Sequence, residues 1–398
     1  MPPRRSKLTR RSATFFIALP LFSAILATSA ITARPTMDSE IDHIIGGGTA
    51  AMVDANSAGG VAAVARIGGR SLFFNYGYAD QAEKRPITSD ALFNVGSVRK
   101  VFEATLLAQG VLRGDIGLEE PAAKYVTELN GDYIRQVTIG QLASHTSGLL
   151  LPTDHPPWPS EHFSLAGFYD ALNAWTPSGG ERPGNQRIYT HAGYVLLQLV
   201  LGRRYGKPIA ELLDRRIIAP LGMTSTIVPE RGPDNQAIMT PQLLRRAVQG
   251  YSLDGEAIGR PGNQQSYFDF PGTGQMFSSA HDLAILLAAC LDERPMDPDL
   301  RKALLLAQSE QFRDSARYGQ AMAWEIENSL GVTIVDKPGG LDNASAYVGL
   351  IPDRKIGLVI LANRGDVHPF EAARRTILPE LARLIPPRRP QVAGGVAR

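Results

Sequence analysis

Strand-like segments lie near both ends of this chain, and a long helix-rich region separates them. Residues 60–78 are typical of a β-hairpin, because two apolar runs meet at a glycine pair. Further strands are predicted at residues 321–326, 331–336, 345–351 and 356–361, whereas helices punctuated by proline and glycine occupy residues 118–310. The simplest assembly is one antiparallel sheet that draws strands from both ends, with a helical part inserted between them.

Terminal helices are predicted at residues 38–52 and 371–384, and they would cover this sheet. We therefore expect an α/β (α+β) fold, with residues 34–105 and 311–388 in a sheet subdomain and residues 106–310 in a mostly helical subdomain. Residues 389–398 are expected to form a flexible tail. The cleft between the two subdomains is the natural place for an active site.

The first 33 residues are expected to be a secretory signal peptide. Five basic residues precede an apolar run, and small residues follow it. Without this segment the chain has 36 basic and 39 acidic side chains, a net charge of −3, which gives no reason to expect nucleic acid as a partner. Cys290 is the only cysteine, so no internal disulfide is expected. We expect a periplasmic monomer without a membrane span, exported by the Sec route, with the twin-arginine route as the alternative.

The most informative stretch is residues 93–100, FNVGSVRK, which opens an apolar helix. Ser97 is expected near the helix N-terminus, where the helix dipole and free N–H groups favour negative charge. Lys100 follows on the same helical face, and a buried lysine can take the hydroxyl proton of a serine nucleophile. A Ser-x-x-Lys pair is a weak signal by itself, because a capping serine and a solvated lysine have the same spacing.

Two further segments carry candidate partners. Tyr189 precedes an apolar helix predicted at residues 195–202, and a phenolate near lysines could act as a base. A core tyrosine with a satisfied hydroxyl is the alternative. Lys337 is expected at a strand end before Pro338-Gly339-Gly340, where the ammonium group can meet a substrate carboxylate and backbone N–H groups can approach an oxyanion. A turn with a surface lysine is the alternative there.

In this order, the motifs Ser-Val-Arg-Lys, Tyr-Thr-His and Lys-Pro-Gly resemble those of the serine β-lactamase and penicillin-binding protein superfamily. The resemblance is closest to class C β-lactamases, whose pattern is Ser-x-x-Lys, Tyr-x-Asn and Lys-Thr-Gly. It covers about residues 41–384 and includes the stretches 139–149, 219–223, 306–309, 323–325 and 357–363.

The resemblance implies a β-lactamase/transpeptidase-like fold and a hydrolase that opens β-lactam antibiotics through an acyl-enzyme on Ser97, conferring antibiotic resistance. Lys100 and Tyr189 would move protons, and Lys337 would lie near Tyr189 and the substrate carboxylate. The backbone N–H groups of Ser97 and Gly340 would form the oxyanion hole. That chemistry needs no metal or organic cofactor.

The chain departs from the family pattern around the substrate carboxylate. His191 stands in place of asparagine, and Pro338 stands in place of threonine, so that a hydroxyl group is missing. His368 and Glu371 align with an asparagine and an arginine that help to hold the carboxylate in many class C enzymes. Arg99 replaces a small residue inside the first motif. The carboxylate pocket is therefore expected to be rebuilt, while the nucleophile and its bases are kept.

We expect His191, Lys337, Gly339 and His368 to bind substrate. A histidine titrates near neutral pH, so His191 is a candidate to assist deacylation, with carbapenem-derived acyl-enzymes included. A second hypothesis is that His191 and His368 bind a Zn²⁺ ion that modulates activity. The alternative is that both side chains are neutral hydrogen-bonding substitutes.

Other functions on the same fold remain open at this point. The missing threonine hydroxyl favours a D-alanyl-D-alanine carboxypeptidase, a D-aminopeptidase that acts on peptidoglycan stem peptides, or an esterase. A slow-turnover penicillin-binding sensor is a third reading. An α/β-hydrolase is disfavoured, because the chain has no Gly-x-Ser-x-Gly segment. The first hypothesis remains a β-lactamase that hydrolyses penicillins and cephalosporins, with carbapenems as possible further substrates.

Overall fold

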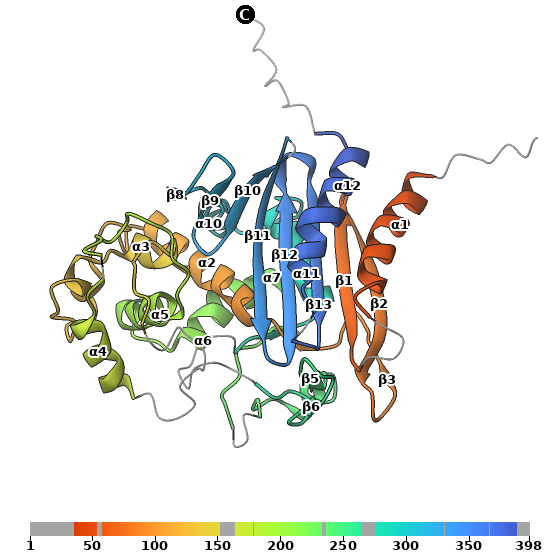
Figure 1. Ribbon diagram of the computed structural model, residues 1–398, viewed down its shortest axis with the longest axis horizontal. Coiled ribbons are helices and arrows are strands. Elements are labelled where there is room, and N and C mark those ends of the chain that lie inside the picture. The colour runs from red at the N-terminus through yellow and green to blue at the C-terminus, as the bar shows by residue number, and fades with distance from the viewer. Residues whose placement is uncertain are drawn as a thin grey trace, which may run out of the picture. The chain divides into compact units, whose positions relative to one another are not determined.

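Within the described residues, nine strands form one antiparallel sheet in the order β3-β2-β1-β13-β12-β11-β10-β9-β8 (Figure 1). The computed structural model describes residues 36–53, 58–151, 164–177, 179–232, 236–264, 275–329, 331–365 and 367–387. The predicted signal peptide and C-terminal tail lie outside this part of the chain. No helix in the described part is long and apolar enough to cross a bilayer.

The strands of the large sheet come from both ends of the chain, as predicted. They are β1 Gly60–Ile67, β2 Arg70–Asp80, β3 Arg85–Pro86, β8 Phe312–Arg313, β9 Tyr318–Gln320, β10 Glu325–Ser329, β11 Val332–Leu341, β12 Ala344–Ile351 and β13 Ile356–Ala362. Two short strand pairs stand apart from it: β4 Phe93–Asn94 with β7 Phe277–Ser278, and β5 Gly250–Tyr251 with β6 Ala257–Ile258.

The central region is mostly helical, and helices also flank the sheet. The α-helices are α1 Met37–Ala50, α2 Arg99–Leu112, α3 Ile139–Ala143, α4 Leu165–Ala174, α5 His191–Tyr205, α6 Ile209–Leu213, α7 Ala219–Leu221, α8 Pro241–Leu244, α9 Ala280–Cys290, α10 Pro298–Ala307, α11 Pro369–Ala372 and α12 Leu378–Leu384. A π-helical turn, Ala373–Ile377, joins α11 to α12, so the predicted C-terminal helix begins two residues earlier than expected. The division into subdomains at residues 105 and 310 stays a prediction.

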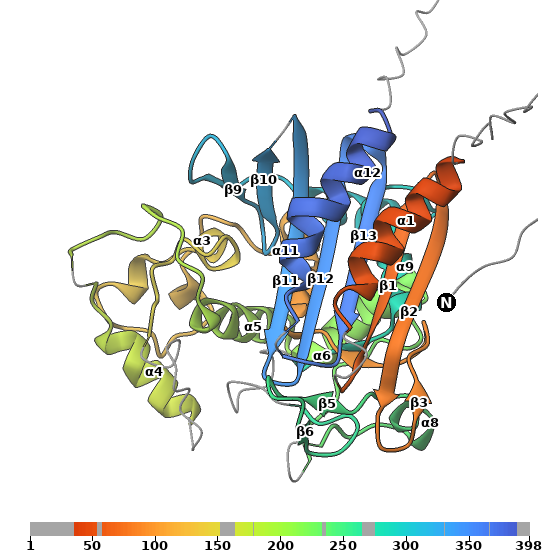
Figure 2. The same ribbon diagram turned by 45° about the vertical axis from the view of Figure 1, so that its right-hand side comes forward.

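Both faces of the central strands β1, β12 and β13 are buried, and their successive residues contribute to different cores. In β1, Ala62 and Val64 pack with α2 and α9, whereas Val61 and Ala63 pack with α1 and α12. Helices α1, α11 and α12 cover this second face (Figure 2). Side chains alternate across a strand, so a strand that is apolar on both sides can be covered only by two layers of helices.

The structure corrects the expected ends of two strands. The predicted strand at residues 321–326 begins only at Glu325, because Ala323 has a positive φ of 63° and the chain turns there. Lys337, expected at a strand end, lies inside β11, whose residues 337–341 pair with β12. β10 pairs only with residues 332–336, so in the described part of the chain no strand covers the other edge of residues 337–341. Pro338, which lacks an N–H donor, is tolerated at such an edge.

Alternation along β11 sends Lys337 toward the helical region and the preceding Asp336 toward α12. Asp336 is fully buried, and its carboxylate accepts hydrogen bonds from Arg374 Nε over 2.5 Å and from Tyr347 OH over 2.7 Å. Burial raises the pKa of Asp336, and the hydrogen bonds and charge of Arg374 oppose this shift. The buried carboxylate thus depends on its partners for stability.

We expect Tyr347→Phe to lower the free energy of unfolding by about 1–3 kcal/mol, because the buried Asp336 carboxylate loses a donor. Urea denaturation of both proteins measures this difference. Tyr78→Phe is the control, since Tyr78 is 38% exposed. Equal midpoints for Tyr347→Phe and the wild type would show that this hydrogen bond contributes nothing.

Candidate active site

Ser97 lies in the 3₁₀ turn Gly96–Val98, which joins β4 to α2. Gly96 has φ of 51°, a conformation that favours glycine. Its N–H donates to the side-chain oxygen of Asn94 over 3.2 Å, which fixes the entry to the turn. Ser97 is therefore held just before the first turn of α2, as the sequence predicts.

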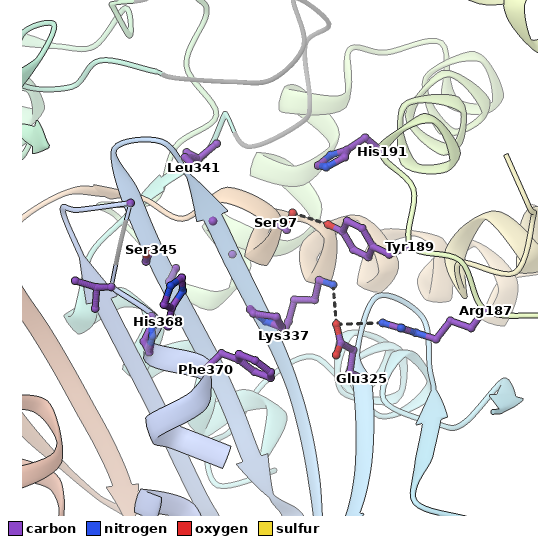
Figure 3. Close-up of a pocket in the computed structure, with 17 residues that line it drawn as sticks. Ser97, Arg187, Tyr189, His191, Glu325, Lys337, Leu341, Ser345, His368 and Phe370 are labelled. Carbon is purple, nitrogen blue, oxygen red and sulfur yellow. Dashed lines mark hydrogen bonds and ion pairs between the residues drawn. The ribbon is translucent and has the colours of Figure 1, made fainter. Parts of the chain in front are cut away.

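Three predicted side chains meet around the Ser97 hydroxyl. Tyr189 OH lies 2.6 Å from Ser97 Oγ (Figure 3), and Lys100 Nζ donates to the same oxygen over 3.1 Å. Lys337 Nζ lies 4.5 Å from the centre of the Tyr189 ring, and Lys100 Nζ lies 5.4 Å from it. Both lysines are 1% exposed. The hydroxyl thus has two neighbours of the type that receives a proton from a serine nucleophile.

The start of α5 positions Tyr189. Thr190 caps this helix, because its hydroxyl oxygen accepts a hydrogen bond from Gly193 N over 3.2 Å. Behind the phenol, the His145 ring lies 4.3 Å from the Tyr189 ring, and His145 Nδ1 accepts a hydrogen bond from Thr190 N over 3.4 Å. Burial, followed by the charges of Lys337 and Lys100, lowers the pKa of His145 well below its ordinary value. His145 is a neutral support, and sequence reasoning missed it although it lies in the resembling stretch 139–149.

The open edge of β11 approaches the Ser97 turn through glycines. A Cβ atom at Gly339 would lie 2.3 Å from the Val95 carbonyl oxygen and 3.1 Å from Ser97 N. A Cβ atom at Gly96 would lie 3.0 Å from Gly340 N. Only residues without side chains allow this approach, which brings the backbone segments of Ser97 and Gly340 together. Two N–H groups on neighbouring segments are the arrangement that an oxyanion requires.

A pocket of about 450 Å³ opens beside the serine. Every predicted substrate-binding residue lines it, together with others that were not predicted. The lining residues are Ser97, Arg187, Tyr189, His191, Glu325, Lys337, Pro338, Gly339, Gly340, Leu341, Ser345, Ala346, Gly365, Val367, His368, Pro369 and Phe370. Lys100 reaches the site from beneath through its hydrogen bond to Ser97.

Glu325 places a carboxylate in this pocket (Figure 3). It lies 3.5 Å from Lys337 Nζ, 3.3 Å from the Arg187 guanidinium and 2.9 Å from that of Arg374. Burial alone would raise the pKa of Glu325, but the positive charges of Lys337, Arg374 and Arg187 lower it overall. Glu325 is therefore ionised at neutral pH, and it shares the charge of Lys337. Sequence reasoning missed both Arg187 and Glu325, although Arg187 lies two residues before Tyr189 and Glu325 lies in a resembling stretch.

The surroundings of His191 argue against the expectation that it titrates near neutral pH. Its ring stands edge-on to Tyr189, with the two ring centres 5.5 Å apart. Burial, followed by the charges of Lys100 and Lys337, lowers the pKa of His191 well below its ordinary value. Adding a proton there would place a further positive charge beside the two lysines, so the surroundings disfavour the charged form of His191.

We expect His191→Asn to leave the shape of the kcat/KM profile between about pH 6.5 and 8 unchanged, because His191 carries no proton to lose in that range. The lowered pKa means that His191 would gain its proton only at more acidic pH. Steady-state rates across this range measure the effect, and His281→Asn, whose side chain is 58% exposed, is the control. An inflection near pH 6.5 that disappears only in His191→Asn would restore the titration hypothesis.

Metal ligation was predicted only as a hypothesis for His191 and His368. Both residues line the pocket. Within the ranges that the structure describes, no group of three or more histidine, cysteine, aspartate or glutamate side chains is arranged to hold a metal ion. The zinc hypothesis gains no support from this geometry.

Comparison with known proteins gives one consistent result. The family model described as Beta-lactamase matches residues 48–382. A "Beta-lactamase" of Escherichia coli (strain K12) is 26% identical over 388 residues, covering 88% of this chain and 96% of that protein. A "Beta-lactamase" of Pseudomonas fluorescens is 25% identical over 332 residues, covering 74% of this chain and 86% of that protein.

Solved structures share the fold. "A class C beta-lactamase" is 21% identical with a TM-score of 0.73, and the match covers 87% of this chain and 96% of that one. A "Beta-Lactamase/D-Alanine Carboxypeptidase" from Pseudomonas syringae is 22% identical with a TM-score of 0.72, and the match covers 87% and 98%. These likenesses confirm the predicted fold class.

Proposed function

The chain belongs to the beta-lactamase family of hydrolases, and we propose that it hydrolyses β-lactam antibiotics through an acyl-enzyme on Ser97. The observation that carries this proposal is the pair of contacts at the Ser97 hydroxyl, 2.6 Å to Tyr189 OH and 3.1 Å to Lys100 Nζ. The site combines a serine that has two proton-accepting neighbours with a glycine-lined backbone edge and an adjoining pocket. These features equip it for acyl transfer.

In the proposed reaction, Ser97 Oγ attacks the lactam carbonyl carbon, and its proton passes to Lys100 in its amine form or to Tyr189 in its phenolate form. The N–H groups of Ser97 and Gly340 stabilise the negative charge that develops on the carbonyl oxygen. The carbon–nitrogen bond then breaks, and the ring nitrogen takes a proton. Tyr189 assists the water molecule that releases the acyl group. Side chains and backbone groups of this chain supply each of these roles, so the reaction needs no cofactor.

A second candidate is a carboxypeptidase acting on peptides that end in D-alanine, an activity named for one of the solved structures that share the fold. Such peptides also carry a terminal carboxylate, so the surface next to Lys337 is altered for both kinds of substrate. Pro338 offers no hydroxyl to a substrate carboxylate, and Glu325 lies 3.5 Å from Lys337 Nζ and shares its charge. A site that holds the lactam carboxylate less firmly would rely more on other contacts of the substrate.

The test is a panel of a chromogenic cephalosporin, benzylpenicillin, a carbapenem and a D-alanyl-D-alanine peptide, each measured in single-turnover and steady-state experiments. The β-lactamase proposal is supported if the steady-state rate of lactam hydrolysis agrees with the acylation and release rates from the single-turnover experiment. Peptide turnover, with lactams acting only as slow inhibitors, favours the carboxypeptidase. A covalent lactam adduct that is not released, with no peptide turnover, identifies a slow-turnover penicillin-binding protein.

We also propose that residues 1–33 direct the protein to the periplasm. Support comes from the five basic residues, the apolar run and the small residues that follow it. Cell fractionation and N-terminal sequencing of the exported protein test this, and an intact N-terminus in the cytoplasmic fraction contradicts it. That a zinc ion on His191 and His368 modulates activity stays a hypothesis. Hydrolysis rates that do not change after chelation or after zinc addition would rule it out.

A further inference from the structure

The turn that follows α3 holds a histidine at a position that favours glycine. α3 ends at Ala143. Beyond it, His145 N donates to the Leu142 carbonyl oxygen over 3.5 Å, and Thr146 N donates to the Gln141 carbonyl oxygen over 2.9 Å. A helix that ends with this pair of hydrogen bonds usually has glycine, and sometimes asparagine, where His145 stands. His145 has a φ of 56°, a conformation that costs a residue with a side chain more than it costs glycine.

The imidazole of His145 carries a second cost. It is 0% exposed, and its Nδ1 accepts a hydrogen bond from Thr190 N, so in the neutral ring Nε2 carries the proton. Nε2 is buried without a hydrogen-bond partner among the described residues. Glycine at this position would avoid both the backbone cost and the unmet donor. Residues that combine such costs cluster where the folded protein uses the side chain, so His145 calls for a role.

The contacts of His145 lie on both sides of Tyr189. Its carbonyl oxygen accepts a hydrogen bond from Ile188 N over 2.8 Å, and its Nδ1 accepts the one from Thr190 N over 3.4 Å. Between these two contacts, the His145 ring lies 4.3 Å from the Tyr189 ring, with the planes inclined by 35°. One residue therefore holds the peptide groups on either side of the tyrosine as well as its ring.

We propose that His145 is a positioning residue, which holds the Tyr189 hydroxyl at Ser97 Oγ by binding the backbone on both sides of Tyr189 and by stacking on its ring. Because His145 is fully buried, it acts through Tyr189 and does not touch the substrate. A proton-transfer group that moves by about 1 Å can lose on the order of 10²-fold in rate. The inference rests on the proposed function of Ser97, and it is the same for a lactam and for a peptide substrate.

A double-mutant cycle tests this role. His145→Gly removes the ring and the Nδ1 acceptor, and glycine suits the conformation of the turn. On the substrate that the wild type turns over fastest, we expect kcat/KM to fall by about 10- to 100-fold, mainly through kcat. In the Tyr189→Phe background the same change should cost less than about threefold, because the hydroxyl that His145 positions is already absent.

His145→Asn is the second variant, and it is used in the same cycle if the space left by glycine unfolds the protein. Asparagine also adopts the left-handed conformation, and its amide oxygen can accept the hydrogen bond from Thr190 N, but it has no ring. We expect it to be at least about threefold more active than His145→Gly. Ile139→Ala is the matched control, since Ile139 is a buried residue of α3. This control should lower the thermal unfolding midpoint and keep kcat within about threefold of the wild type.

A loss of kcat that disappears in the Tyr189→Phe background supports the proposal. Equal losses in both backgrounds, wild-type kcat in a folded His145→Gly protein, or an equal loss of kcat in Ile139→Ala overturns it. Equal activities of His145→Asn and His145→Gly overturn the part assigned to the hydrogen bond. A wild type that no compound of the panel acylates overturns the proposed function of Ser97, and this inference with it. A reactive wild type with additive losses overturns only the role of His145.

Discussion

Ser97→Ala is expected to lower kcat/KM by about 10⁶-fold on the best substrate of the panel, because the proposed reaction has no other route to the acyl-enzyme. The loss should appear in kcat, and the variant should still bind substrate, since the pocket and the lysines are unchanged. Rapid mixing with a chromogenic substrate and mass spectrometry of the protein measure turnover and acylation separately.

The control for Ser97→Ala is its folding. Ser97 Oγ contacts Tyr189 and Lys100 but buries little surface of its own, so the thermal unfolding midpoint should stay close to that of the wild type. A folded Ser97→Ala protein that keeps a rate within about tenfold of the wild type, or still forms a covalent adduct, would contradict the assignment of Ser97 as nucleophile.

Tyr189→Phe is expected to lower kcat/KM by about 10²- to 10⁴-fold, because it removes the hydroxyl group that lies 2.6 Å from Ser97 Oγ and keeps the ring. The ring still occupies the space between the two lysines, so the pocket should keep its shape. Single-turnover measurements of the acylation and deacylation rates show which of the two steps depends on the Tyr189 hydroxyl.

Tyr194→Phe is the matched control for this change. Its ring also lies near Lys100, 5.5 Å from Nζ, but its hydroxyl donates to the Ala143 carbonyl oxygen over 2.8 Å. Burial raises the pKa of Tyr194 well above its ordinary value, so this phenol does not act as a base. We expect Tyr194→Phe to reduce stability by about 1–3 kcal/mol and to keep most of the activity. Equal loss of activity in both variants would mean that Tyr189 acts through packing.

Much of the fold could be predicted because its strands and helices have strong local patterns. β1, β12 and β13 alternate between two buried faces, and their apolar runs are long. The predicted end of a strand at Asp336 was wrong. The prediction followed from Pro338 and the two glycines after it, residues that usually stop a strand. In the structure, pairing with β12 carries β11 through them, and a proline is compatible with the edge that β10 leaves uncovered.

The sequence by itself determined the residues around the serine, since Ser97, Lys100, Tyr189 and Lys337 stand in short segments whose order is informative. Only the tertiary structure decided their electrostatic surroundings. Glu325 meets Arg187 across 138 positions of the chain, and Arg374 reaches the same carboxylate from the helices on the other face of the sheet. The low pKa of His191 likewise depends on its burial and on two lysines from distant segments. Local patterns specify which groups are present, whereas charge and burial depend on which distant groups the folded chain brings within a few ångströms.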